Sequence, residues 1–141
     1  MTTSAQNQLI TWSDQYSVGI ARIDGEHRKL VELINDLYSA MLEGRGRTSL
    51  GRVLDGVADY TRTHFVNEER LMRIHNYPGL DTHKAEHDRL IAKVKILQDD
   101  QRSGKPAVSV EVMRFLKAWL MDHIQGMDKK TAAHLLAAGV K

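Results

Sequence analysis

Residues 61–87 read TRTHFVNEERLMRIHNYPGLDTHKAEH, a turn with a helix-like segment on either side. The segment Asn76–Gly79 is a strong turn signal, because asparagine, proline and glycine together favour a reversal of the chain. On either side of this turn, polar residues recur at a spacing of four, namely His64 with Glu68 and His83 with His87. Residues four apart share one face of a helix. The stretch therefore predicts two helices joined by a tight turn, each with a polar pair on one face.

Apolar residues continue the same period away from this stretch, in alternating steps of three and four. They predict helices at about 23–43, 48–75, 81–102 and 108–127. Short loops between helices of similar length force neighbouring helices to be antiparallel. We therefore predict an all-α fold, an up-down-up-down antiparallel four-helix bundle. An N-terminal arm (1–22) and a short C-terminal helix (about 129–138) complete a single domain over residues 1–141.

The composition excludes several classes of protein. The 141 residues carry 20 Lys+Arg against 18 Asp+Glu, interspersed along the chain, so we expect no nucleic-acid partner. Cysteine is absent, which excludes disulfides and thiolate metal sites. No apolar run reaches the ~20 residues that a membrane span needs, and the N-terminus lacks a secretory signal pattern. We expect a cytoplasmic monomer without membrane insertion, because no large apolar stripe stays exposed once the bundle is packed.

Histidines occupy positions where a helical bundle normally has leucines. Six polar residues lie on the inner stripes of the four predicted helices: His27, His64, Glu68, His83, His87 and His123. A buried ionised carboxylate is costly unless it is paired or bound to a metal. Because all four helices contribute, these groups can converge on one point inside the bundle.

A single core histidine is more often a structural residue than a metal ligand, but chance does not easily give this whole set. His75, at the turn, and His134, on the terminal helix, fall outside the pattern. Imidazole and carboxylate donors suit a first-row transition metal better than magnesium or calcium. With Asp128, the seven groups exceed what one metal binds with a position left open. Two ions that share two bridging carboxylates account for the number better.

Asp128 needs a local change of helix geometry. It follows His123 by five residues, and five residues of an ideal α-helix rotate a side chain about 140° away from the starting face. A π-type bulge near Gly126 would bring the carboxylate back to the interior. We predict such a bulge.

The segment from His83 to His87 also reads as H-x-x-E-H, the inverted zinc-protease motif, in which Glu86 would be a general base. That alternative leaves four inner polar residues unexplained, and the bundle leaves no room for a substrate cleft. We therefore expect Glu86 to be a surface residue or an outer partner of the site.

Four motifs together resemble the hemerythrin (haemerythrin) family, most closely its bacterial single-domain form, the bacteriohemerythrins. They are Ile23–His27, His64–Glu69, His83–His87 and Trp119–His123, the last continuing through Ile124 to Lys130. The resemblance extends from about Trp12 to Lys130. Each motif alone is weak, but the order H…HxxxE…HxxxH…HxxxxD is highly specific.

The resemblance implies a role for each matching residue. His83, His87 and His123 would bind a coordinatively saturated iron, and His27 and His64 a second iron with an open position. Glu68 and Asp128 would bridge the two iron ions (Fe2+/Fe3+), together with an oxo or hydroxo group. An apolar oxygen pocket would be lined by Leu30, Phe65, Trp119, Leu120 and Ile124.

The implied function is reversible dioxygen binding for oxygen storage or delivery, without enzymatic turnover. Histidine dominates the ligand set, which favours binding of oxygen over its activation. The alternatives are an oxygen or redox sensor, against which the lack of an attached signalling domain weighs, and a di-iron enzyme that handles peroxide or nitric oxide. The sequence departs from the usual bacterial pattern at Thr131–His134, where an aromatic residue commonly follows the lysine pair. We expect this departure to change how the C-terminal segment packs over the site.

Overall fold

The computed structural model describes residues 8–103 and 109–141. Predictions for the start of the arm, the loop at 104–107 and residue 108 lie outside these residues. The described elements are, in order, η1 (Asp14–Tyr16), α2 (Ala21–Leu42), α3 (Gly46–Ile74), α4 (Leu80–Arg102), α5 (Ser109–His123), the π-helical turn η2 (Ile124–Asp128) and α6 (Lys129–Ala137). The described residues form helices and no strand, which confirms the all-α prediction.

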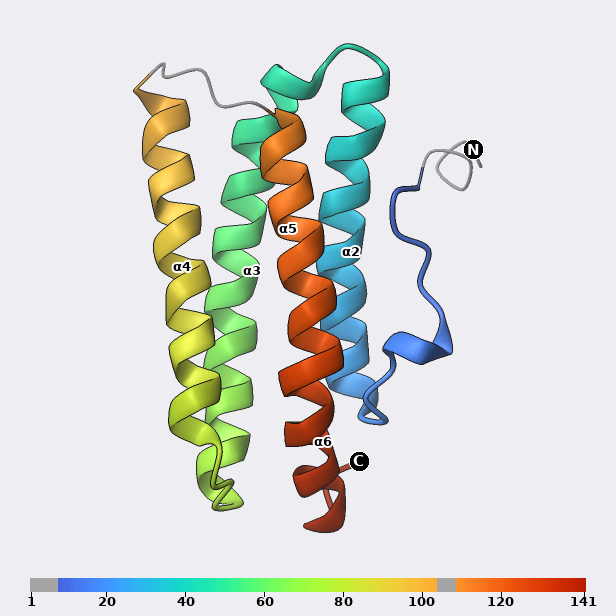
Figure 1. The fold of residues 1–141 in the computed structure, drawn as a ribbon, viewed down its shortest axis with the longest axis vertical. Coiled ribbons are helices and arrows are strands. Elements are labelled where there is room, and N and C mark those ends of the chain that lie inside the picture. The colour runs from blue at the N-terminus through green and yellow to red at the C-terminus, as the bar shows by residue number, and fades with distance from the viewer. Residues whose placement is uncertain (1–7, 104–108) are drawn as a thin grey trace.

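The four long helices lie side by side, and consecutive helices run in opposite directions (Figure 1). Helix α3 packs against both α2 and α4, and α5 packs against α2. This arrangement confirms the up-down-up-down antiparallel bundle. No described helix combines the length and the apolar character needed to cross a bilayer.

The turn between α3 and α4 follows the sequence signal. Asn76 takes a positive φ of 53°, a left-handed conformation that asparagine tolerates better than most residues. The amide of Tyr77 donates to the carbonyl of Met72 at 2.8 Å, which closes the end of α3. The two helices that carry the four-residue pairs are thereby held antiparallel.

The C-terminal helix is not separated from the bundle by a loop. Helix α5 leads through η2 directly into α6, so the three form one continuous rod (Figure 1). The π turn absorbs the extra residue that would otherwise have to loop out. The predicted bounds also placed the starts of the first two helices at 23 and 48, two residues later than Ala21 and Gly46.

The arm is fixed to α2 by hydrogen bonds and by apolar contacts. Asn35 accepts the amides of Leu9 and Ile10 at 3.0 and 2.9 Å and donates to the carbonyl of Ile10 at 2.9 Å. The Asp24 carboxylate accepts the amide of Val18 at 2.8 Å. Ile10 and Val18 are buried, so the arm seals one flank of the core.

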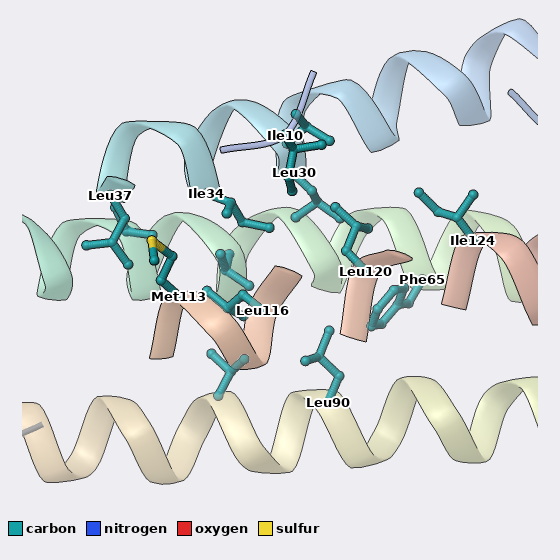
Figure 2. Close-up of a cluster of buried hydrophobic side chains, with 14 of the residues drawn as sticks. Ile10, Leu30, Ile34, Leu37, Phe65, Leu90, Met113, Leu116, Leu120 and Ile124 are labelled. Carbon is teal, nitrogen blue, oxygen red and sulfur yellow. The ribbon is translucent and has the colours of Figure 1, made fainter. Parts of the chain in front are cut away.

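Buried aliphatic side chains fill the bundle at the end away from α6. Figure 2 shows Leu37, Met113 and Leu116 there, with Leu120 and Phe65 further along the same core. This apolar stack gives the fold its packing energy. Near Phe65, buried polar side chains join the apolar ones, among them Glu68, His83 and Asp128.

Candidate metal centre

Seven polar side chains form one buried cluster inside the bundle. Each of them is at most 3% exposed. Helix α2 contributes His27, α3 contributes His64 and Glu68, α4 contributes His83 and His87, α5 contributes His123, and η2 contributes Asp128. The structure therefore brings together all seven residues that the sequence proposed as metal ligands.

The carboxylate of Glu68 points its two oxygens at different histidines. Its Oε1 lies 2.9 Å from Nε2 of His83 and 3.1 Å from Nε2 of His87. Its Oε2 lies 3.3 Å from Nε2 of His64, one helical turn earlier on α3. One carboxylate thus connects two groups of imidazoles.

Asp128 divides its oxygens in the same way. Its Oδ1 lies 3.0 Å from Nε2 of both His83 and His123, whereas Oδ2 lies 2.8 Å from Nε2 of His27. The π-helical turn Ile124–Asp128 brings this carboxylate inward, so the predicted bulge is confirmed. The oxygens Oε1 and Oδ1 face a group of three imidazoles, and Oε2 and Oδ2 face a group of two.

The spacing of these atoms fits donors around transition-metal ions. Two neighbouring donors at about 2.1 Å from one octahedral ion lie about 3.0 Å apart, and the contacts between the donor atoms of this cluster span 2.8–3.3 Å. The Nε2 atoms of His83 and His123 face each other at 3.1 Å. Two overlapping sets of potential ligands arise, one of Glu68, His83, His87, His123 and Asp128 and one of His27, His64 and Glu68.

Unpartnered polar atoms point to the same conclusion. Among the described residues, ten buried side-chain nitrogens and oxygens lack a hydrogen bond, and eight of them belong to this cluster. Six of the eight face the middle of the cluster, namely Nε2 of His27 and His87 and the four carboxylate oxygens of Glu68 and Asp128, as expected for lone pairs directed at a common centre. Buried polar groups are rarely left unsatisfied. The donor set therefore fits a bound metal.

The electrostatics of the cluster couple imidazoles to carboxylates. Burial alone would lower the pKa of His83, but Asp128 and Glu68 raise it to about 9. Burial and Asp128 would raise the pKa of Glu68, yet the nearby imidazoles of His83, His87 and His64 lower it to about 2. Burial likewise opposes the low pKa of Asp128, which contacts with His123, His27 and His83 hold well below its usual value. Protons shared this way are the ones a metal ion displaces.

Three residues outside the predicted set of ligands contact the outer nitrogens of the histidines. Nδ1 of His64 lies 2.6 Å from Oε1 of Glu26, and Nδ1 of His87 lies 2.9 Å from Oε2 of Glu69. Nδ1 of His83 lies 2.6 Å from the hydroxyl of Thr131. Such partners fix the tautomer so that Nε2 keeps a free lone pair for a metal. Glu26 directly precedes His27, and Glu69 directly follows Glu68. This adjacency to a candidate ligand is the sequence feature that could have indicated their role.

Aromatic rings cover two of the imidazoles. Phe65 stacks on His87 with ring centroids 3.7 Å apart and planes 3° apart. Trp119 stacks on His123 at 4.5 Å and 14°. Both contacts restrict the rotation of the imidazoles and exclude water from that side.

The five predicted oxygen-pocket residues are only partly gathered. Leu30, Trp119 and Leu120 line an apolar cavity of about 10 Å³, close to the smallest volume that holds a water molecule. Phe65 and Ile124 are buried in the same core but do not line this cavity (Figure 2). The cavity walls are apolar throughout.

The remaining polar residues of interest lie outside the cluster. Glu86 pairs with Arg89 at 2.5 Å on the surface of α4, so it does not face the imidazoles as a general base would. Nε2 of His134 donates to the backbone carbonyl of His75 at 2.7 Å, which ties α6 to the end of α3. Neither histidine belongs to the metal-binding sets of the described residues.

The fold and the site define a four-helix-bundle protein with a buried histidine and carboxylate metal centre. The Hemerythrin HHE cation binding domain model matches residues 18–135. The bacteriohemerythrin of Stenotrophomonas maltophilia (strain R551-3) is 36% identical over 129 residues, covering 92% of this chain and 83% of that protein. The chain belongs to the hemerythrin family.

More distant relatives agree with this assignment. The myohemerythrin of Riftia pachyptila is 30% identical over 124 residues, covering 88% of this chain and 92% of that protein. A crystal structure of wild-type hemerythrin superposes with a TM-score of 0.82 at 31% identity, covering 90% of this chain and 98% of that one.

Proposed function

We propose that this chain binds dioxygen reversibly at a non-haem di-iron centre and serves in oxygen storage or delivery. The observation that carries the proposal is the division of two buried carboxylates between two groups of imidazoles. Glu68 and Asp128 each present one oxygen to either group. That arrangement is what two adjacent metal ions with two carboxylate bridges require.

The ligand sets differ in number, and this difference supports an open position at one iron. His83, His87 and His123, with one oxygen from each carboxylate, offer five donor atoms to the first iron. His27 and His64 with the two other oxygens offer four. A shared oxo or hydroxo bridge would bring these counts to six and five. When bound, the two irons supply the electrons and the vacant position for dioxygen.

The protein's part is to keep protons and water away from that position. The carboxylates of Glu26 and Glu69 contact the outer nitrogens of their histidines, on the side away from the cluster. Leu30, Leu120 and Ile124 are buried apolar residues and carry no proton donor. A site without a directed acid favours release of unchanged dioxygen over its reduction.

The test is an oxygen titration of the iron-loaded, reduced protein under argon. We expect an absorption band that appears with dioxygen, disappears on purging and returns over repeated cycles. The variant His83→Ala should lose iron and the band, whereas His75→Ala, which lies outside the cluster, should keep both. Irreversible oxidation with turnover of peroxide or nitric oxide would instead indicate an enzyme. A large conformational change with weak binding would indicate a sensor.

The remaining expectations are part of the same proposal. We propose a monomeric single domain over residues 1–141. In the part of the chain that the structure describes, the large exposed apolar side chains are spread over four helices: Leu42, Val66, Ile74, Ile91, Ile96 and Leu136. Sedimentation at several concentrations tests the monomer. The proposed compartment is the cytoplasm, which cell fractionation tests. We expect no nucleic-acid binding, and a filter-binding assay checks this.

A further inference from the structure

The three outer partners of the histidines differ in charge. Glu26 and Glu69 are carboxylates, and they contact His64 and His87 at 2.6 and 2.9 Å. His83 has a neutral partner in the same role, the hydroxyl of Thr131 at 2.6 Å. The strength of an imidazole as a metal ligand depends on this outer contact, because an acceptor that draws on the Nδ1 proton makes Nε2 more basic.

Thr131 is held beside His83 by its place on the helix that follows the π turn. It is 1% exposed and lies on α6, three residues after Asp128. Residues three apart in a helix share a face, so the π turn that brings Asp128 inward also brings Thr131 inward. The two residues approach His83 from opposite ends of its ring, Asp128 at Nε2 and Thr131 at Nδ1.

The hydroxyl of Thr131 has one proton to donate and accepts through its lone pairs. The sulfur of Met72 lies 4.0 Å from the Thr131 oxygen and takes the position of its acceptor. The oxygen lone pairs are then available for the Nδ1–H of His83. These contacts connect His83 on α4 through Thr131 on α6 to Met72 on α3, and all three side chains are buried.

We propose that Thr131 is a positioning residue for the metal ligand His83. Its hydroxyl holds the tautomer with the proton on Nδ1, so that Nε2 is directed at the metal, and its neutrality leaves His83 a weaker donor than His64 or His87. This inference rests on the proposed function, because it requires His83 to bind a metal. Removing the hydroxyl leaves a buried N–H without an acceptor, a defect that destabilises this orientation of the ring.

The experiment compares three full-length variants with the wild type. Thr131→Val removes the hydroxyl at nearly constant shape, Thr131→Ser keeps it, and Thr63→Val is a control at an exposed threonine of α3. Zn2+ affinity is measured by competition with a chelator, and the imidazole protons of the Zn2+-loaded proteins by nitrogen-15 NMR. Thr131→Val should weaken Zn2+ binding about 10–100-fold and lose the protected Nδ1 proton of His83. Thr131→Ser and Thr63→Val should match the wild type.

Three results would overturn the inference. The first is a Thr131→Val protein with wild-type Zn2+ affinity and an intact His83 Nδ1 proton. The second is a Thr131→Ser protein as weakened as Thr131→Val, because then the shape of threonine matters and not its hydroxyl. The third is a wild-type protein that binds neither Zn2+ nor iron, which also contradicts the proposed function, whereas the first two leave it standing. If Thr131→Val does not fold, NMR of the Zn2+-loaded wild type is the test. A contact between the His83 Nδ1 proton and the Thr131 methyl group must then be observed, and its absence would overturn the inference.

Discussion

The π-helical turn gives the sharpest test of how the backbone builds the site. At about 100° per residue, a regular α-helix would turn Asp128 about 140° away from the face of His123. Deletion of Gly126 places Asp128 four positions after His123, and four residues of a regular helix rotate a side chain only about 40° off the starting face. Gly126 is exposed and its Cβ position has no neighbour within 4 Å, so no packing is lost with it. We expect the deletion variant to keep both metal ions.

An insertion at the same point should do the opposite. One alanine after Gly126 makes the separation six residues, which in a regular helix directs Asp128 about 120° off the face. On a helix of ~2.3 Å radius, that rotation moves the Asp128 Cα by about 4 Å. The 3.0 Å contact from Asp128 to His123 cannot survive such a shift. We expect the insertion variant to hold at most one metal ion per chain.

Both variants are reconstituted with iron and compared by elemental analysis, with circular dichroism as the check on folding. Two irons in the insertion variant would show that the π turn does not place Asp128 in the site. A folded deletion variant that loses as much iron as the insertion variant would show the same.

Three further predictions concern stability. Phe65→Ala should lower the free energy of unfolding by about 3–5 kcal/mol, measured with urea, whereas the exposed Val66→Ala should change it by less than about 0.5 kcal/mol; equal effects would contradict the packing described. In the metal-free protein, His83 stabilises the fold fully below pH 6.5 and this contribution is lost as the pH rises toward its pKa of about 9, by up to about 1.4 kcal/mol per pH unit. The pKa of Glu68 is lowered from 4.5 to about 2, so its contribution to the free energy of unfolding is lost as the pH falls from 4.5 toward 2. Urea titrations that show no loss of stability at high or low pH would refute the roles of His83 and Glu68. Asp24→Ala should cost about 1–3 kcal/mol and speed proteolysis of residues 8–20, because the carboxylate accepts the amide of Val18; an unchanged cleavage rate would mean that the arm is held by other contacts.

The sequence was sufficient for the bundle and for the inner polar residues, for a physical reason. Helical periodicity fixes which side chains share a face, so residues such as His64 and Glu68 on one stripe had to face inward together. The inward position of Asp128 is harder to predict, because its spacing of five residues from His123 does not match the period of an α-helix. Its place among the ligands is implied by the resemblance to the hemerythrin family, and a bulge is then needed for its carboxylate to face inward. The π turn Ile124–Asp128 supplies that bulge.

The outer partners could not be predicted in the same way. Two of them, Glu26 and Glu69, lie next to the inner stripes of their helices, and Thr131 lies beyond the π turn. Their contacts therefore depend on how neighbouring helices are rotated about their axes. Side chains from two different helices meet in each case, at 2.6–2.9 Å. Periodicity within one helix carries no information about that rotation. The same limit applies to the continuous rod of α5, η2 and α6, which the sequence presented as two separate helices.

The most direct test of the di-iron claim is anomalous X-ray diffraction at the iron edge from crystals of the iron-loaded protein. We expect two iron peaks per chain. One should lie among the Nε2 atoms of His83, His87 and His123, the other beside His27 and His64, with Glu68 and Asp128 contacting both. A single iron peak, or two peaks that share neither carboxylate, would contradict a di-iron centre bridged by Glu68 and Asp128.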